Sequence, residues 1–173
     1  MSKKLRIIFS GIENSGKTTL AKILAPILGY ELIEEQCRFN PDVIKGEETS
    51  KTLLELHSIQ ENLFDAAYSS SARGVVCDTS GVELEVWAKV KFGENISCDF
   101  NLDSTLYFFC HTLKDWEEDP LRGMPDYNDR LKHQEYFESC LREKNIPYIE
   151  LQDSSLVDRV AVVVEEINAF LNG

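Results

Sequence analysis

Gly11-Ile12-Glu13-Asn14-Ser15-Gly16-Lys17-Thr18 carries more structural information than any other segment of this chain. It matches, without a gap, the pattern G-x-x-x-x-G-K-S/T of a phosphate-binding loop. An apolar run at residues 5–9 precedes the loop, and an amphipathic helical pattern at 17–28 begins inside it. The alternative is a glycine-rich turn that arose by chance. Because a strand and a helix both stand where the motif needs them, the pattern favours a phosphate-binding loop.

Each residue type in this loop has a chemical reason to be there. The glycines allow backbone N–H groups to turn towards an anion, and the helix N-terminus adds its partial positive charge. Lys17 is expected to reach the β- and γ-phosphates, and the hydroxyl of Thr18 is expected to bind Mg²⁺. The sequence therefore predicts binding of ATP or GTP with Mg²⁺. The predicted nucleotide contacts are Gly11, Glu13, Asn14, Ser15, Gly16, Lys17, Thr18 and Thr19.

The composition is that of an ordinary globular protein, with 43% hydrophobic and 28% charged residues. The length predicts a single domain over residues 1–173. The formal net charge of −12 argues against nucleic acid or an anionic membrane as a partner. The five cysteines form no C-x-x-C pair, which indicates a reducing compartment and therefore the cytoplasm. Nothing in the sequence indicates the oligomeric state.

Apolar runs alternate with helical patterns along the chain. Runs that are apolar throughout are typical of strands buried on both faces of a parallel sheet. The order of the elements therefore predicts a three-layer α/β fold of the P-loop NTPase type, with five parallel strands and helices on both faces. The predicted strands are 5–9, 31–34, 74–78, 105–110 and 147–151, and the predicted helices are 17–28, 49–71, 82–92, 129–144 and a last one from Ser155. Residues 39–48 are expected to form a loop, and the last helix is expected to serve packing only.

Asp78 ends the predicted strand 74–78. A phosphate-binding loop needs a second Mg²⁺ anchor, and this is usually an Asp at the end of a neighbouring strand. Asp78 is therefore predicted to bind the metal together with Thr18. The alternative is an Asp that only caps a turn before the next helix.

Asp78-Thr79-Ser80-Gly81 also spells D-x-x-G, a pattern that small GTPases use to sense the γ-phosphate. Two features weigh against a GTPase. A long amphipathic helix, not a strand, is predicted before Asp78. After the fourth strand the sequence reads His111-Thr-Leu-Lys-Asp115, which differs from a guanine-reading N-K-x-D in both residues and spacing.

Two further segments suggest a kinase. Residues 116–130 stand where small-molecule kinases carry a lid, and they contain Arg122 and Arg130 among the breakers Pro120, Gly123 and Pro125. Guanidinium groups suit the charge of a phosphoryl group in transfer, although surface ion pairs are the alternative. Residues 34–38 follow the second strand, where a carboxylate and an arginine would face an acceptor. A solvated acidic loop is the other interpretation of this second segment.

Several of these motifs resemble one family. The loop is similar to G-x-E-S-S-G-K-S/T with Asn14 in place of Ser, and Glu35-Gln-Cys-Arg38 matches E-x-x-R. Residues 76–79 are similar to an I-D-T run, 116–122 to a W-x-x-D-G-L-R lid start and 146–150 to a closing strand. Together they resemble, over most of the chain and at low identity, the ribosylnicotinamide kinase domain of NadR-type proteins and its P-loop relatives. Two departures are Pro120 for the lid glycine and Ser80 for a second Asp.

The resemblance implies ATP-dependent phosphorylation of a nucleoside hydroxyl, as on nicotinamide riboside. It implies that Glu35 and Arg38 face the acceptor and that Asp78 serves Mg²⁺ or the acceptor hydroxyl. It places Asp119, Arg122 and Arg130 in a lid. The sequence is thus interpreted as a small-molecule kinase with Lys17, Asp78, Arg122 and Arg130 as catalytic residues. Two alternatives stay open: a GTPase-like or ATPase-type regulatory module without a small acceptor, and a fold that binds nucleotide without turnover.

Overall fold

The computed structural model describes residues 4–71, 73–99 and 101–173, which are arranged around one parallel sheet. Five strands pair in the order β2-β3-β1-β4-β5, and every pairing is parallel. The predicted α/β fold of the P-loop type is confirmed. The strands are β1 (Leu5–Ser10), β2 (Glu31–Ile33), β3 (Gly74–Asp78), β4 (Thr105–Cys110) and β5 (Ile149–Leu151). The longer helices are α1 (Lys17–Leu28), α3 (Ser50–Ser70), α4 (Gly81–Trp87), α5 (Tyr127–Glu143) and α6 (Leu156–Asn172).

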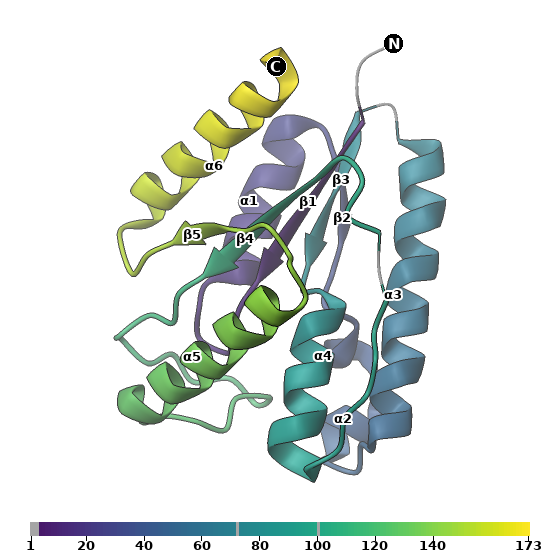
Figure 1. Cartoon of the computed structure of the whole chain (residues 1–173), viewed down its shortest axis with the longest axis vertical. Helices are drawn as coiled ribbons and strands as arrows, with labels where there is room; N and C mark the ends of the chain where they lie inside the picture. Colours follow the sequence, from purple (N-terminus) through teal and green to yellow (C-terminus); the bar gives the residue numbers. More distant parts are fainter. Residues whose placement is uncertain (1–3, 72, 100) are drawn as a thin grey trace.

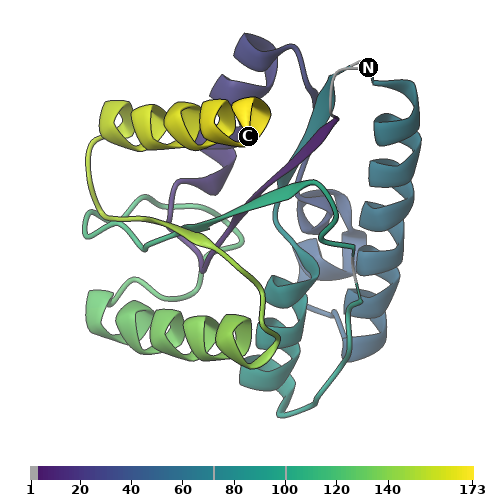
Figure 2. The ribbon, with the colours of Figure 1, turned by 45° about the horizontal axis from the view of Figure 1, so that its top comes forward.

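Helices cover both faces of the sheet (Figure 1). In the turned view, α6 and α1 lie above the sheet, whereas α5 and α4 lie below it (Figure 2). Alternation along β1 explains the two layers, since successive side chains of a strand point to opposite faces. Leu5, Ile7 and Phe9 pack in one core cluster with α1 and α6, and Ile8 packs in the other with α3, α4 and α5.

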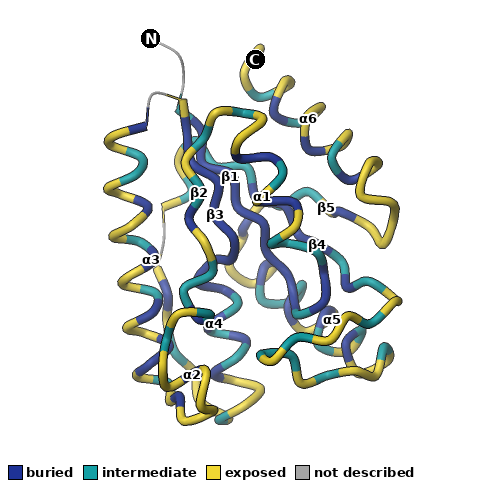
Figure 3. Tube along the Cα trace, turned by 180° about the vertical axis from the view of Figure 1, so that it is seen from behind, coloured by how far each residue is buried: buried dark blue, intermediate teal, exposed yellow. Residues whose placement is uncertain are grey.

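The central strands β1 and β3 are buried along their whole length (Figure 3). This burial explains why the two strands read as unbroken apolar runs. The parallel direction brings their carboxyl ends to one edge of the sheet, where the phosphate-binding loop and Asp78 follow. At this edge Gly11 has a φ of 141°, and a Cβ there would lie 2.4 Å from the carbonyl oxygen of Cys110. Glycine is therefore required where the loop leaves β1.

The prediction of a loop at 39–48 is wrong. A 3-10 helix, η1 (Gln36–Phe39), is followed by a short helix, α2 (Pro41–Lys45). The side chain of Asn40 caps α2 by accepting hydrogen bonds from the backbone of Asp42 and Val43, and Pro41 takes the first helical position. Proline is favoured at this position because its missing N–H is not needed there. The breakers Pro41 and Gly46 thus delimit a helix.

The predicted helix at 82–92 forms in two parts. The α-helix α4 begins at Gly81, where Ser80 and Glu83 make a capping box. It continues as a single π-helical turn, η2 (Ala88–Phe92), which ends at Gly93. Local hydrophobic spacing does not distinguish an α-turn from a π-turn, so the sequence could predict only the combined segment.

The last helix, α6, packs through only part of its apolar residues. Val157 is 77% exposed and Leu171 is also exposed. The buried side chains are Arg159, Val163 and Ile167. Besides this packing, α6 makes a polar contact with the phosphate-binding loop, because Arg159 donates a hydrogen bond to the carbonyl oxygen of Ser15. Among the described residues, no helix has the length and apolar character needed to span a membrane.

Candidate active site

A cavity of about 510 Å³ opens at the carboxyl edge of the sheet. One wall is the phosphate-binding loop, and the opposite walls come from the segment after β2, from α4 and η2, and from residues 113–124. Several predicted site residues line it, whereas Asp78, Asp119 and Arg130 are not among its lining residues. The predicted residues that line it are Gly11, Glu13, Asn14, Ser15, Gly16, Lys17, Thr18, Thr19, Glu35, Arg38 and Arg122.

Side chains of the phosphate-binding loop donate hydrogen bonds to the backbone carbonyl groups of the same loop. Lys17 donates from Nζ to the carbonyl oxygens of Gly11 at 2.7 Å and Ile12 at 2.8 Å. Ser15 donates to the carbonyl oxygen of Ile12 at 2.7 Å. Helix α1 begins after Gly16, whose φ is 77°, and no side chain in the described part of the chain caps it. The first N–H groups of α1 therefore remain available to an anion.

Asp78 is a buried carboxylate placed beside this loop. It is 2% exposed, and its Oδ1 has no hydrogen-bond partner among the described residues. Burial raises the pKa of Asp78 to about 6, and Glu35 adds to the rise. Lys17, a hydrogen bond from Thr18 and Arg38 oppose it. A buried carboxylate oxygen without a partner, next to the Thr18 hydroxyl, has the chemistry of a Mg²⁺ ligand pair.

Glu35, Arg38 and Asp119 come together from distant parts of the chain. Arg38 donates to Glu35 at 2.9 Å and to Asp119 at 2.9 Å. Burial alone would raise the pKa of Asp119, but the Leu121 N–H and Arg38 stabilise the carboxylate and lower it. The two segments that carried the E-x-x-R and lid motifs are thus joined through one guanidinium group. The resemblance placed Glu35 and Arg38 at the acceptor and Asp119 in the lid, and the structure joins the three residues through ion pairs.

Asn14, in the phosphate-binding loop, holds the distant segment 113–122 against that loop. Its Nδ2 donates to the carbonyl oxygens of Leu113 and Asp115. Its Oδ1 accepts from the backbone of Glu117 and, at 3.1 Å, from Arg122. Asn14 therefore holds the predicted lid and aims Arg122 at the loop.

Glu13 strengthens this attachment. Its carboxylate accepts from the backbone N–H groups of Gly123, at 3.0 Å, and Met124. The predictions gave Glu13 and Asn14 nucleotide contacts, and the structure shows that their side chains bind the lid segment.

Arg130 does not have the role that was predicted for it. It is fully buried, and two aromatic rings, those of Trp116 and Tyr127, lie against its guanidinium group. Its hydrogen bonds run to the hydroxyl of Thr112 and to the carbonyl oxygens of Leu113, Lys114, Met124 and Pro125. In the structure Arg130 therefore holds the base of the predicted lid segment, and its donors are directed at protein groups.

Glu83 was missed by sequence reasoning. Its carboxylate accepts from the Gly11 N–H at 3.1 Å and from the Ser80 N–H at 2.9 Å. Burial raises the pKa of Glu83 to about 7, while Lys17 and Ser80 oppose the rise. It lines the cavity and links the start of the loop to the segment after Asp78. The spacing Ser80-x-x-Glu83 is a capping-box pattern, so a search for helix caps would have found it.

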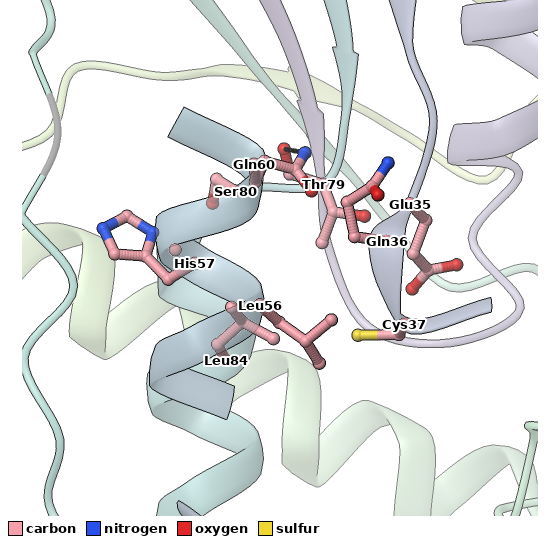
Figure 4. Close-up of a pocket in the computed structure, with 10 residues that line it drawn as sticks. Glu35, Gln36, Cys37, Leu56, His57, Gln60, Thr79, Ser80 and Leu84 are labelled. Atoms are coloured by element: carbon pink, nitrogen blue, oxygen red, sulfur yellow. Dashed lines mark hydrogen bonds between the residues drawn. The ribbon is translucent and has the colours of Figure 1, made fainter. Parts of the chain in front are cut away.

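A second, much smaller cavity of about 10 Å³ lies behind Glu35, between α3 and the segment after β3 (Figure 4). Gln60 reaches from α3 and donates to the carbonyl oxygens of Asp78 at 3.3 Å and Thr79 at 3.4 Å. His57 also lines it and contacts the carbonyl oxygen of Asp99 at 2.9 Å. Gln60 thus supports the backbone that carries Asp78.

Comparison with known proteins shows a family match and a shared fold. A protein-family model described as "AAA domain" matches residues 6–159. No curated protein matches the chain. A structure of the NadR protein in complex with NR superposes with a TM-score of 0.79 at 19% identity, covering 98% of this chain and 52% of that one. The chain thus spans about half the length of NadR.

Two complete kinases share the fold. Deoxyadenosine kinase from M. mycoides aligns with a TM-score of 0.63 at 12% identity, over 95% of this chain and 99% of that chain. Shikimate kinase from Acinetobacter baumannii aligns with a TM-score of 0.56 at 14% identity, over 97% of this chain and 95% of that chain. The resemblance to NadR-type and related P-loop kinases is confirmed in the fold, and because the family model covers most of its length, the chain belongs to the AAA domain family.

Proposed function

We propose that this protein is a small-molecule kinase that transfers the γ-phosphoryl group of ATP to a hydroxyl of a nucleoside such as nicotinamide riboside. One observation carries the proposal. Asp78 has a carboxylate oxygen without a hydrogen-bond partner among the described residues, and it is near enough to Lys17, Thr18, Glu35 and Arg38 for each of them to shift its pKa. A group that must serve both a nucleotide and an acceptor belongs at that position. The shared fold with NadR bound to NR and with deoxyadenosine kinase supports the choice of acceptor.

The phosphates would be held by the N–H groups of the loop and by Lys17. Thr18 and Asp78 would hold Mg²⁺, which when bound supplies charge neutralisation for the phosphates. On binding, Lys17 would exchange its contacts with the carbonyl oxygens of Gly11 and Ile12 for phosphate oxygens.

The acceptor would enter from the side of Glu35 and Arg38. Asp78 or Glu35 would accept a hydrogen bond from its hydroxyl and direct the oxygen at the γ-phosphorus. A new O–P bond forms, the bond from the γ-phosphorus to the bridging oxygen breaks, and ADP leaves with the electron pair. The hydroxyl proton passes to the carboxylate or to the transferred phosphoryl group.

All five cysteines are free thiols, which supports a cytoplasmic location.

Arg122 is the lid arginine that remains for the transferring charge, and its replacement by alanine is expected to lower turnover by roughly 10³-fold. Asn14 aims Arg122 at the loop, so the loss should appear in kcat more than in nucleotide affinity. The measurement is steady-state ADP release at saturating ATP. Arg142→Ala is the matched control, because Arg142 is an exposed arginine paired on the surface of α5. An unchanged kcat for the Arg122 variant would remove Arg122 from the mechanism.

The proposal is tested by ADP release from Mg-ATP with and without a panel of nucleosides that includes nicotinamide riboside. Stimulation by one of them, over a low rate without acceptor, is the expected result. Slow hydrolysis that no acceptor changes would instead favour a regulatory ATPase. GTP is tested in parallel, since preference for GTP with acceptor-independent turnover would favour a GTPase-like module.

A further inference from the structure

Arg159 lies in the first turn of α6 and reaches back to the phosphate-binding loop. It is 3% exposed. Its Nη1 donates to the carbonyl oxygen of Ser15 at 2.6 Å, and a Cβ on Gly16 would lie only 3.4 Å from the same nitrogen. The guanidinium group therefore packs against the peptide that joins Ser15 to Gly16.

The other donors of Arg159 tie this contact to the sheet. Nε donates to the carbonyl oxygen of Gln152 at 2.7 Å. Nη2 donates to the carbonyl oxygens of His111 at 2.9 Å and Leu151 at 3.3 Å. These carbonyl groups follow or end β4 and β5. One side chain thus fixes the loop relative to the carboxyl ends of two strands.

No ion pair with Arg159 forms in the described part of the chain, although the charge of Asp153 acts on its guanidinium group from a longer distance and favours its charged form. Within residues 4–71, 73–99 and 101–173, no carboxylate lies within salt-bridge distance of its guanidinium group. Burying a cation that is bound only by carbonyl oxygens opposes folding. Placed behind a loop that holds a polyphosphate, however, the same charge attracts the anion through an interior of low dielectric.

The hydrogen bond to Ser15 also acts through the peptide group. The Ser15 carbonyl belongs to the same peptide as the Gly16 N–H. A cation that polarises the carbonyl makes that N–H a stronger donor, as in cooperative hydrogen-bond chains. Gly16 stands at the uncapped N-terminus of α1, where N–H groups are available to an anion.

We propose that Arg159 is a positioning residue that fixes and polarises the Ser15–Gly16 peptide and so raises the affinity of the loop for the phosphates of a nucleotide. The inference rests on the proposed function in that it assumes a nucleotide in the loop. It gives α6 a part in phosphate binding without contact between Arg159 and the phosphate.

Calorimetric titration of the full chain with Mg-ADP and with magnesium pyrophosphate tests the proposal. Arg159→Gln removes the charge but keeps a hydrogen-bond donor. It is expected to lower the affinity for both ligands by roughly tenfold or more. Arg159→Lys keeps the charge but not the fork of donors, so its affinity should fall between those of Arg159→Gln and the wild type. Arg6→Lys is the control, because Arg6 is equally buried but lies at the opposite end of β1 and pairs with Glu61.

Each outcome bears on the proposal. Arg159→Gln is expected to lose affinity for pyrophosphate and for ADP by the same factor, because both ligands bind the loop through their phosphates. The affinity of Arg6→Lys should stay as in the wild type. Wild-type affinity in a folded Arg159→Gln protein would overturn the proposal. The proposal would also be overturned if Arg6→Lys lost as much affinity as Arg159→Gln, or if Arg159→Gln lost affinity for ADP and not for pyrophosphate. If Arg159→Gln does not fold, wild-type affinity in Arg159→Lys overturns it. If the wild-type protein binds neither ligand, the proposed function fails instead.

Discussion

Replacing Lys17 by alanine is expected to lower acceptor-dependent turnover by about 10²- to 10³-fold or more. Lys17 is the only residue of loop 11–18 whose side chain carries a positive charge. Its Nζ already donates hydrogen bonds to the carbonyl oxygens of Gly11 and Ile12 in the same loop. Without it, the charge that develops on the transferring phosphoryl group loses the one cation that the loop itself supplies. The measurement is the initial rate of ADP release with Mg-ATP and acceptor.

Lys22→Ala is the matched control for this change. Lys22 lies one turn further along the same helix, and it makes an exposed ion pair with Glu34 at 3.2 Å. Surface pairs of this kind contribute little to stability. The control should therefore keep wild-type turnover. A Lys17→Ala protein that is as fast as Lys22→Ala would remove the loop from the reaction.

Replacing Asp78 by asparagine is expected to change activity and stability in opposite directions. Turnover should fall by about 10²-fold or more, because a neutral amide replaces the carboxylate that would hold Mg²⁺. The folded protein should nevertheless become more stable above pH 6. Asparagine has nearly the same shape as aspartic acid, and it avoids the cost of burying a charge.

The direction of the pH effect follows from the raised pKa. Asp78 has a pKa of about 6 when folded, against 3.8 for an ordinary Asp, so the folded state binds more protons between these values. The wild-type free energy of unfolding therefore decreases as the pH rises from about 4 to about 6. Asp78→Asn lacks this decrease. The free energy of unfolding of Asp78→Asn should therefore be close to that of the wild type at pH 4 and should exceed it by roughly 1 to 3 kcal/mol at pH 8.

Urea unfolding at several pH values, with ligands absent, measures this difference. Asp65→Asn is the control, since Asp65 is exposed on α3 and its replacement should leave the pH dependence as in the wild type. If Asp78→Asn were less stable than the wild type at pH 8, the carboxylate would be stabilising the fold. Asp78 would then be a structural residue and not a group poised for a ligand.

The sequence predicted what is encoded by local pattern. The loop 11–18 stands between β1 and α1 as expected, and β3 and β4 have the predicted bounds. Strands buried on both faces give apolar runs that need no tertiary information. The family resemblance singled out Glu35, Arg38 and Asp119 one by one, but it did not predict that Arg38 would pair with both carboxylates.

The roles of Arg130 and Arg159 could not be predicted in the same way. Each is an arginine in a helix, and nothing in its neighbours along the chain shows that most of its partners are backbone carbonyl groups of loops. Arg159 contacts Ser15 across 144 positions of sequence. Arg130 stands in the predicted lid segment and donates to the backbone of that segment. Contacts of this kind depend on the assembled sheet.

Transfer of label from ATP carrying a radioactive γ-phosphoryl group to a nucleoside is the most direct measurement of the proposed reaction. Wild-type protein, Mg²⁺ and nicotinamide riboside or another member of the panel are expected to give a labelled nucleoside phosphate. The Lys17→Ala protein should give almost none. Label that appears only as inorganic phosphate for every acceptor, from a protein that binds Mg-ATP, would contradict the assignment of this chain as a small-molecule kinase.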